Sequence, residues 1–436
     1  MYLEVVTSKI AKVFIIRSFS VMMAFGITIS LARLMSINEF GIYSYGMSLV
    51  NILSIVVSLG LPLLVVRETS RLRHLNQCSG IRSLIYRAGF IAITAWAILA
   101  VIGAAVANLV VAAFSEANAG LVNAVLVYVT VFVLINGLIR IYGEAVKGIG
   151  AVLTAQFADA LRPCGVVIAA VLVIIIPGEM QLRAGDAFRF QIAGAVTTLI
   201  FLHLFFLCRV PQDNRRREHA RAPKLLRLTL AAFPMLFLQL AVFANRELDI
   251  LMLGPMAGAK EAGVYKAVYQ ISMTIQFGIA SVSAALAHEL PALDVPERRQ
   301  EALRSLYTGS RLLLAGIVVA SGTLLIFGEK ILEVFGSEFT SGGPSLVIYA
   351  LGYCSIALFP LAPYIAQMVG LEKLVMRLSV AMIILNCILN YFLIERYGAI
   401  GAAIATVICM WILCAVSAAF IMHYKKFFPG LTLFRR

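Results

Sequence analysis

Long, uncharged apolar runs constrain the fold of this chain more than any other feature of its sequence. Hydrophobic residues make up 61% of its 436 residues, and charged residues only 13%. A helix needs roughly 20 apolar residues to cross a bilayer, because each residue adds ~1.5 Å across a hydrocarbon core of ~30 Å. The runs are continuous and do not alternate in polarity, which excludes the strands of a membrane barrel. We therefore expect an all-α integral membrane protein.

Twelve such runs can be counted along the chain. The first is not followed by a small-residue cleavage site, so we interpret it as a retained helix and not as a signal peptide. Six spans lie on each side of a basic segment, which predicts an N-terminal lobe over 1–212, a linker over 213–227 and a C-terminal lobe over 228–436. The expected spans are 13–34, 42–66, 88–113, 119–140, 152–176, 190–208, 228–253, 263–287, 306–328, 344–369, 375–394 and 399–422.

The distribution of charge fits this topology. Most of the 36 Lys and Arg residues fall in alternate loops, including the run RRREHAR at 215–221. Cytoplasmic loops carry such an excess of cations, so we expect both termini to lie in the cytoplasm. The net charge of +14 then needs no nucleic-acid partner, because its cations are spread over many short loops on one membrane face.

The sequence carries no signature of catalysis or of metal binding. Its seven cysteines form no CxxC pair, its five histidines no HExxH, and neither GxSxG nor a Walker loop occurs. We therefore expect a transporter and not an enzyme. A membrane glycosyltransferase or polymerase would carry a long outer loop, whereas the longest here, near 177–189 and 329–343, are short. A purely structural scaffold is a further alternative, against which the cost of charged residues inside spans argues.

A short phrase recurs about half a chain length apart. NEFGIY at 38–43, between the first two expected spans, is matched by KEAGVY at 260–265, between the seventh and eighth. A weaker match at the same offset pairs VKGI at 146–149 with MVGL at 368–371. Because each unit has an even number of spans, the two units would share one orientation, related by a pseudo-two-fold axis along the membrane normal. The shared Glu, Gly and Tyr suit a helix start, a tight turn and a membrane interface.

Three segments resemble a known family. LARLMSINEFGIYSYGMSLVNILSIVVSLGLPLLVVRE at 31–68 looks like the first two helices of Wzx-type oligosaccharide flippases. These belong to the multidrug/oligosaccharidyl-lipid/polysaccharide (MOP) exporter superfamily, which has the MATE-like fold. LDILMLGPMAGAKEAGVYKAVYQI at 248–271 and GAIGAAIAT at 398–406 resemble recurring phrases of the same family.

The resemblance implies both a fold and a function. The fold would be two six-helix bundles around a central cavity lined by helices 1, 2, 7 and 8. The chain would flip a polyprenyl-pyrophosphate-linked oligosaccharide, an O-antigen or exopolysaccharide repeat unit, to the outer leaflet of the cytoplasmic (inner) membrane by alternating access. The alternative is a drug or small-molecule exporter of the same superfamily, whose acidic or aromatic pocket the cations inside the spans argue against. No bound cofactor is implied, and coupling to H⁺ or Na⁺ stays open. The partners would be the lipid-linked glycan, membrane lipids and assembly proteins such as a polysaccharide polymerase.

Polar residues recur at helical spacing inside several of the expected spans. Charged groups in hydrocarbon are costly and usually face protein or water, and guanidinium and ammonium groups bind phosphate strongly. From this pattern we expect substrate to be bound by Arg17, Asn51, Arg162, Gln239, Arg246, Lys266 and Gln270. Asp159, Glu247 and Asp249 are the candidates for ion coupling.

Simpler interpretations exist for most of these residues. Arg17 and Lys266 lie near enough to the ends of their spans to snorkel toward water. Asp159 and Arg162, three residues apart, can neutralise each other within one lobe. Arg246 can equally form an internal ion-pair cluster with its acidic neighbours.

Overall fold

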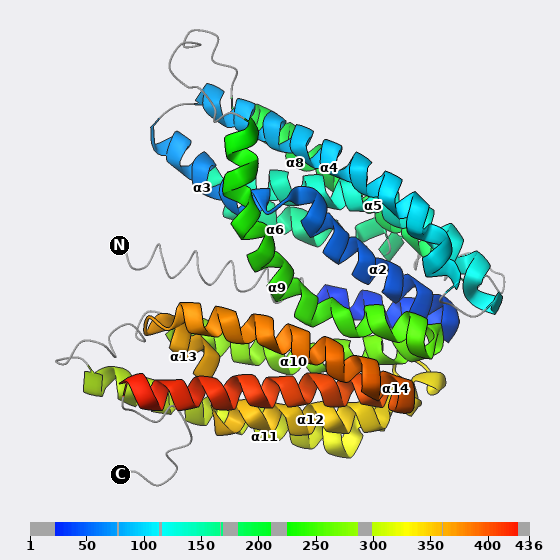
Figure 1. The fold of residues 1–436 in the computed structure, drawn as a ribbon, viewed down its shortest axis with the longest axis vertical. Coiled ribbons are helices and arrows are strands. Elements are labelled where there is room, and N and C mark those ends of the chain that lie inside the picture. The colour runs from blue at the N-terminus through cyan, green and yellow to red at the C-terminus, as the bar shows by residue number, and fades with distance from the viewer. Residues whose placement is uncertain are drawn as a thin grey trace. The chain divides into compact units, whose positions relative to one another are not determined.

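The chain is helical throughout the part that the structure describes. The structure is a computed structural model, and it describes residues 22–75, 78–112, 116–165, 167–168, 182–210, 225–286, 299–359 and 361–425. Every secondary-structure element in these ranges is a helix (Figure 1). The chain divides into two compact units, Met1–Leu251 and Met252–Arg436, and each is described by itself below. The lobe boundaries expected from the sequence stay predictions, since residues 213–224 of the expected linker 213–227 lie outside the described ranges.

Unit 1 is built around one long helix. Helix α5 packs against α2, α3, α4, α6 and α8, so it forms the centre of the unit. A short helical segment at Met22–Leu34 precedes these elements. The helices are α2 (Ile37–Ser58), α3 (Leu61–His74), α4 (Cys78–Ala112), α5 (Glu116–Gly148), α6 (Val152–Leu161), α8 (Ala184–Arg209) and α9 (Leu225–Ala257), of which α9 belongs to this unit as far as Leu251.

Unit 2 packs its helices against α12 and α14. Helix α14 is two helices joined at Gly398, whose φ of 54° is not helical. This break falls between the expected spans 375–394 and 399–422. The elements are α10 (Ala259–Leu286), α11 (Arg299–Glu333), the 3₁₀ helix η2 (Ser337–Gly342), α12 (Gly343–Leu358), α13 (Ala362–Met368) and α14 (Glu372–Lys425).

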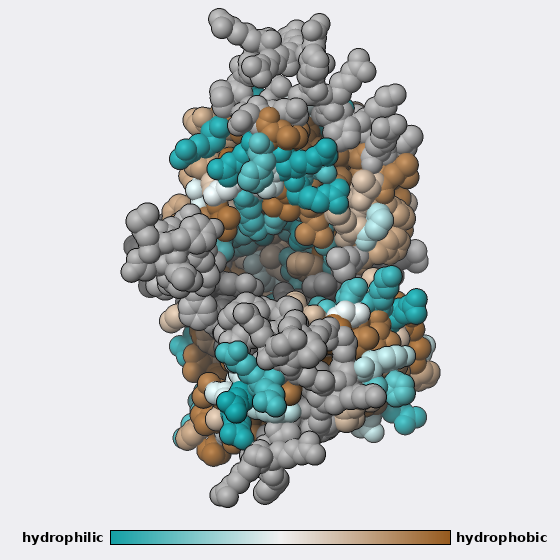
Figure 2. Space-filling view, turned by 90° about the vertical axis from the view of Figure 1, so that its left-hand side faces the viewer, coloured by the Kyte–Doolittle hydropathy of each residue, from teal (hydrophilic) through white to brown (hydrophobic). Residues whose placement is uncertain are grey.

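The surface of these helices suits a membrane. Among the described residues, six helices are long and apolar enough to cross a bilayer. Their outward faces carry large apolar side chains, such as Ile102 on α4 and Ile326 on α11, which are more than half exposed. Figure 2 shows patches of hydrophobic residues on the face in view, beside hydrophilic ones. Water would disfavour so much exposed apolar surface, whereas lipid chains accept it, so the chain is a multi-pass membrane protein.

Three expected spans are interrupted. The expected span 42–66 breaks at Leu59 and Gly60, both with positive φ, and α3 restarts with Pro62 in its first turn. The span 344–369 breaks in the same way at Leu361, before Pro363. The expectation of continuous helices there was wrong, because hydropathy continues across a break that proline and left-handed residues impose on the backbone.

The third interruption affects a predicted site residue. Helix α6 ends at Leu161, so Arg162 lies at its C-terminal cap and not within a continuous span 152–176. The following segment approaches α8 closely: a Cβ on Gly194 would lie 2.7 Å from the Arg162 carbonyl oxygen. A Cβ on Gly165 would clash with the Phe190 carbonyl. Two glycines therefore let the backbone near Arg162 pack directly on α8.

The recurring phrase has the same structural role in both units. It lies in the first turns of α2 and α10 and not in loops, because these helices begin at Ile37 and Ala259. In unit 1 a Glu39 Oε2 accepts a hydrogen bond from the backbone N–H of Ala184, the first residue of α8, at 2.7 Å. In unit 2 a Glu261 Oε2 accepts from the N–H of Ala399, just after the Gly398 break, at 3.0 Å. Each glutamate thus caps a helix that lies far away in sequence.

Candidate functional site

A buried carboxylate links α2 to α9 inside unit 1. Glu247 on α9 is only 7% exposed. Its Oε2 accepts a hydrogen bond from the Ser48 hydroxyl at 2.6 Å, and its Oε1 accepts from the Asn51 side-chain amide at 2.9 Å. Ser48 and Asn51 are three residues apart and share one face of α2. Both oxygens of a costly buried carboxylate are therefore bound by the protein.

A second group of polar contacts surrounds Arg162. One terminal nitrogen of its guanidinium donates to Asn136 Oδ1 on α5 at 3.0 Å, and the other donates to Asp159 Oδ1 on α6 at 2.7 Å. The Asp159 side chain is 50% exposed and that of Arg162 is 27% exposed. The ion pair is consequently open on one side.

Hydrogen bonds join the two groups by way of Asn51, which uses its backbone carbonyl on one side and its side-chain amide on the other. The Asn136 amide donates to the Ser54 hydroxyl at 3.2 Å, and this hydroxyl donates to the backbone carbonyl oxygen of Asn51 at 3.1 Å, while the Asn51 side chain binds Glu247. This chain of contacts therefore runs from Asp159 through Arg162, Asn136, Ser54 and Asn51 to Glu247, and it crosses α6, α5, α2 and α9. We call these six residues the polar chain.

A second guanidinium lies next to the polar chain. Arg140 is one turn from Asn136 on α5, and it donates to Gln239 Oε1 on α9 at 2.6 Å. Its guanidinium carbon is 5.0 Å from the centroid of the Phe243 ring, a cation–π distance. Arg140 also interacts electrostatically with Arg162 and Asp159. Two cations and several amide groups thus gather inside a unit whose helices are otherwise apolar.

Helical spacing explains why these groups meet. Polar residues recur on α2 every three or four positions, which places them along one side of that helix: Ser44, Ser48, Asn51, Ser54 and Ser58. Asn136 and Arg140 stand four apart on α5 and Gln239 and Glu247 eight apart on α9, spacings that keep each pair on one face. Each of the three helices turns one polar stripe toward the others.

The structure describes some predicted site residues and not others. It places Asn51, Asp159, Arg162, Gln239 and Glu247 in or beside the polar chain. Arg17 and the side chain of Arg246 lie outside the described residues. Asp249 is buried on α9, and Lys266 and Gln270 are half-buried on α10 in unit 2. For these last residues the binding or coupling role stays a prediction.

Sequence reasoning missed Arg140, Asn136 and Ser54. Arg140 is the last residue of the expected span 119–140 and was therefore not considered as a site residue, but α5 continues to Gly148. An Asn and an Arg four residues apart at the end of an apolar run were the available signal. Ser54 continues the polar spacing of Ser48 and Asn51, and that spacing was the signal for it, although a serine in an apolar helix often bonds only to its own backbone.

A comparison with protein families identifies the fold. Residues 6–287, well over half of the chain, match the model of a family described as polysaccharide biosynthesis protein. The chain belongs to the polysaccharide biosynthesis protein family. The resemblance to flippases of polysaccharide biosynthesis noted from the sequence motifs is confirmed.

Curated relatives of this polysaccharide biosynthesis protein carry two kinds of description. The probable low-salt glycan biosynthesis flippase Agl15 of Haloferax volcanii is 26% identical over 188 residues, 42% of this chain and 38% of that protein. The probable multidrug resistance protein NorM of Bacillus subtilis is 24% identical over 237 residues, 50% of each chain. The chain spans about half or less of the length of these relatives.

Solved structures extend the similarity to nearly the whole chain. A multidrug resistance MATE family transporter of the MOP superfamily, in an inward-facing conformation, matches with a TM-score of 0.71 at 14% identity, over 94% of this chain and 98% of that one. The lipid II flippase MurJ, in an inward closed conformation, also matches with a TM-score of 0.71, at 15% identity, over 93% of this chain and 86% of that one. At this identity the comparison shows a shared fold.

Proposed function

We propose that this protein is a transporter that flips a polyprenyl-pyrophosphate-linked oligosaccharide from the cytoplasmic to the outer leaflet by alternating access. The observation that carries the proposal is the pair of guanidinium groups, Arg140 and Arg162, set among amide side chains inside a membrane-spanning unit. In the proposed topology twelve spans form two six-helix lobes with both termini in the cytoplasm. A polysaccharide polymerase and other assembly proteins would act beside it.

The chemistry of such a cargo matches the residues present. A pyrophosphate carries negative charge, and sugar hydroxyls need hydrogen-bond partners that hydrocarbon cannot supply. Within the described part of the chain, the Nε atoms of Arg140 and Arg162 are buried without a protein partner, so each guanidinium has a donor that would bind a phosphate oxygen once the helices part to admit the cargo. The Gln239 amide nitrogen is likewise unpaired there and can serve a hydroxyl. The lipid tail would stay in the bilayer throughout.

Coupling to an ion is the second part of the proposal. Glu247 is the strongest candidate, because it is buried and joined through the polar chain to Arg162. Uptake of H⁺ or Na⁺ at Glu247 would neutralise the carboxylate and weaken its bond to the Asn51 amide. Asp159 and Asp249 stay candidates for the same role.

The alternative is a drug exporter, and the buried Glu247 carboxylate together with the NorM relatives favours it. An organic cation would need that carboxylate as its counter-ion. Both Glu247 oxygens already accept hydrogen bonds from Ser48 and Asn51, whereas the two guanidinium groups retain free donors. The unpaired groups are therefore better suited to an anionic cargo than to a cationic one.

Deletion of the gene separates the two functions. We expect the deletion strain to lose its surface glycan and to accumulate the lipid-linked precursor. An unchanged glycan combined with altered drug sensitivity would overturn the flippase proposal and support the exporter. Complementation with Arg162→Ala should fail to restore the glycan at normal protein levels.

Reconstituted transport tests the residue assignment directly. Proteoliposomes carrying a fluorescent lipid-linked oligosaccharide should flip it roughly 10- to 100-fold more slowly with Arg162→Ala, since a hydrogen bond to a charged group contributes ~1.5–3 kcal/mol and 1.4 kcal/mol is a factor of ten. Arg189→Ala is the matched control, because Arg189 forms the same i,i+3 pair with Asp186 at 3.1 Å but on the exposed start of α8. Equal rates for both variants would refute the site.

A further inference from the structure

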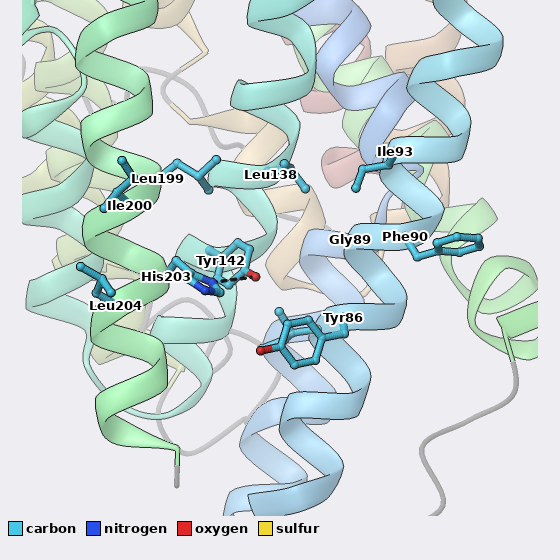
Figure 3. Close-up of a pocket in the computed structure, with 11 residues that line it drawn as sticks. Tyr86, Gly89, Phe90, Ile93, Leu138, Tyr142, Leu199, Ile200, His203 and Leu204 are labelled. Carbon is cyan, nitrogen blue, oxygen red and sulfur yellow. Dashed lines mark hydrogen bonds between the residues drawn. The ribbon is translucent and has the colours of Figure 1, made fainter. Parts of the chain in front are cut away.

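An apolar crevice in unit 1 is lined by side chains of α4, α5 and α8, and none of the polar-chain residues lines it. It has a volume of about 530 Å³, within the range of small-ligand pockets. Side chains of α4 and α8 face each other across it, and α5 lies between the two helices (Figure 3). Its lining includes Phe90 and Ile93 on α4, Leu138 on α5, and Leu199 and Leu204 on α8.

The crevice follows from the packing of three helices and one missing side chain. Helices α4 and α8 both pack on α5, which forms the floor. Gly89 lies on the α4 wall, and a Cβ added there would meet only Leu138, at 3.9 Å. At one end Arg82 joins the walls, since its guanidinium donates to the carbonyl oxygens of Val210 at 2.6 Å and Leu207 at 3.1 Å.

The lining suits a hydrocarbon chain and little else. Its polar partners, the His203 ring and the Tyr142 hydroxyl, are hydrogen-bonded to each other at 3.1 Å, so they are satisfied without a ligand (Figure 3). Tyr86, Ile200 and Leu204 on the walls are each more than half exposed. On a membrane-spanning protein such residues face lipid, and an unfilled apolar crevice would forfeit its dispersion contacts.

Positive charge lies at one end of the crevice. Arg82 is one turn from Tyr86 on α4, and Arg209 is five residues beyond Leu204 on α8, so both cations lie ~6–8 Å further along their helices. Arg209 is exposed, with its guanidinium 5.7 Å from the Phe205 ring centroid. Basic groups at the ends of spans attract anionic head groups.

We propose that this crevice is a binding site for one acyl chain of an anionic phospholipid, whose head group is held at the end marked by Arg82 and Arg209. The site is separate from the cargo site and does not depend on the identity of the cargo. Its occupant would join α4 to α8 along a face where the two helices meet mainly through α5 and Arg82.

A cross-linking experiment tests the site on the full-length protein. The protein is reconstituted with phosphatidylglycerol that carries a photoreactive diazirine in the middle of one acyl chain, and labelled peptides are mapped after illumination. We expect labelling concentrated on residues 86–93 of α4 and 199–204 of α8. Labelling spread evenly over the exposed faces of α4, α8 and α11 would overturn the proposal.

Matched variants sharpen the test. Gly89→Leu fills the crevice and should reduce this labelling at least fivefold, whereas Gly103→Leu, on the same helix with open space around it, should leave it unchanged. Ile200→Trp fills the crevice from the α8 wall and serves if Gly89→Leu does not fold. Normal labelling of a folded, filled variant would refute the site.

Two further probes identify the occupant. The corresponding phosphatidylcholine probe should label less than phosphatidylglycerol, and Arg209→Gln should narrow that difference. Equal labelling by the two probes in the unmodified protein would overturn the assignment to anionic lipid. Loss of label on adding polyprenyl phosphate would identify the carrier lipid as the occupant instead.

Discussion

Replacing Glu39 with alanine should destabilise unit 1 by an amount that can be worked out from one contact. The Glu39 carboxylate accepts a 2.7 Å hydrogen bond from the N–H of Ala184, a residue with 0% exposure. A hydrogen bond to a charged group contributes ~1.5–3 kcal/mol, and the negative charge at the start of α8 adds ~0.3–1 kcal/mol. The total is about 2–4 kcal/mol. At roughly 2 °C per kcal/mol, we expect the Tm of unit 1 to fall by roughly 4–8 °C.

The chain offers a separate optical probe for each unit. It has two tryptophans, Trp96 on α4 in unit 1 and Trp411 on α14 in unit 2. With Trp411→Phe as background, thermal unfolding followed by fluorescence reports unit 1. With Trp96→Phe as background it reports unit 2, where Glu261→Ala should lower the Tm in the same way.

Two variants distinguish the cap from other effects of the charge. Glu39→Gln keeps an oxygen that can accept from Ala184, and this neutral bond retains ~0.5–1.5 kcal/mol, so the variant should lose only about 1–2.5 kcal/mol. Glu301→Ala removes an exposed glutamate from the first turn of α11 and should lose no more than the dipole contribution of ~0.3–1 kcal/mol. If Glu39→Ala unfolds within about 1 °C of the parent, or if Glu39→Gln is equally damaging, the capping argument is wrong.

Three further predictions concern close approaches and the second guanidinium. Gly60→Ala should sharply reduce the amount of folded protein, because φ is +74° and the new Cβ would lie 2.5 Å from an α9 carbonyl oxygen. Gly143→Ala, with open space around it, should express normally. Western blotting compares the amounts of the two variants. Gly398→Ala should destabilise unit 2, since its Cβ would lie 2.9 Å from the capping carboxylate, and the Trp fluorescence assay measures this. Arg140→Ala and Gln239→Ala should show a coupling of at least about 0.5 kcal/mol in a double-mutant cycle of thermal stability, whereas additive effects would contradict the 2.6 Å bond.

The sequence predicts where the helices lie, because each membrane-spanning helix must be a continuous apolar run. Apolar runs identified helices in the right places, and the Gly398 break fell between two expected spans. Hydropathy does not reveal a backbone break inside an apolar run, so the interruptions at Leu59 and Leu361 were not predicted. In both places the residues on either side of the break remain apolar, and only the backbone changes direction.

Contacts between residues distant in sequence could not be predicted, for a different reason. The repeated glutamate lies in the first turn of a helix in each unit, and a helix start was its expected position. Its partner, however, is 145 residues away for Glu39 and 138 for Glu261, a pairing that only the tertiary fold creates. Arg140 was missed because hydropathy falls at the end of its span, although the helix itself continues for two more turns to Gly148.

Arg162 shows how the structure bears on two interpretations that the sequence left open. A neutralising ion pair requires only Asp159, three residues earlier on the same segment, and that pair is present. Neutralisation gives no reason for the second donor nitrogen to reach Asn136, or for Asn136 to lead through Ser54 and Asn51 to a buried carboxylate. Buried polar networks are costly unless every member is satisfied, so one that crosses four helices calls for a further role. Under the proposed function the Arg162 guanidinium would hold an anion, and Asn136 fixes its position through a nitrogen that the ion pair does not use.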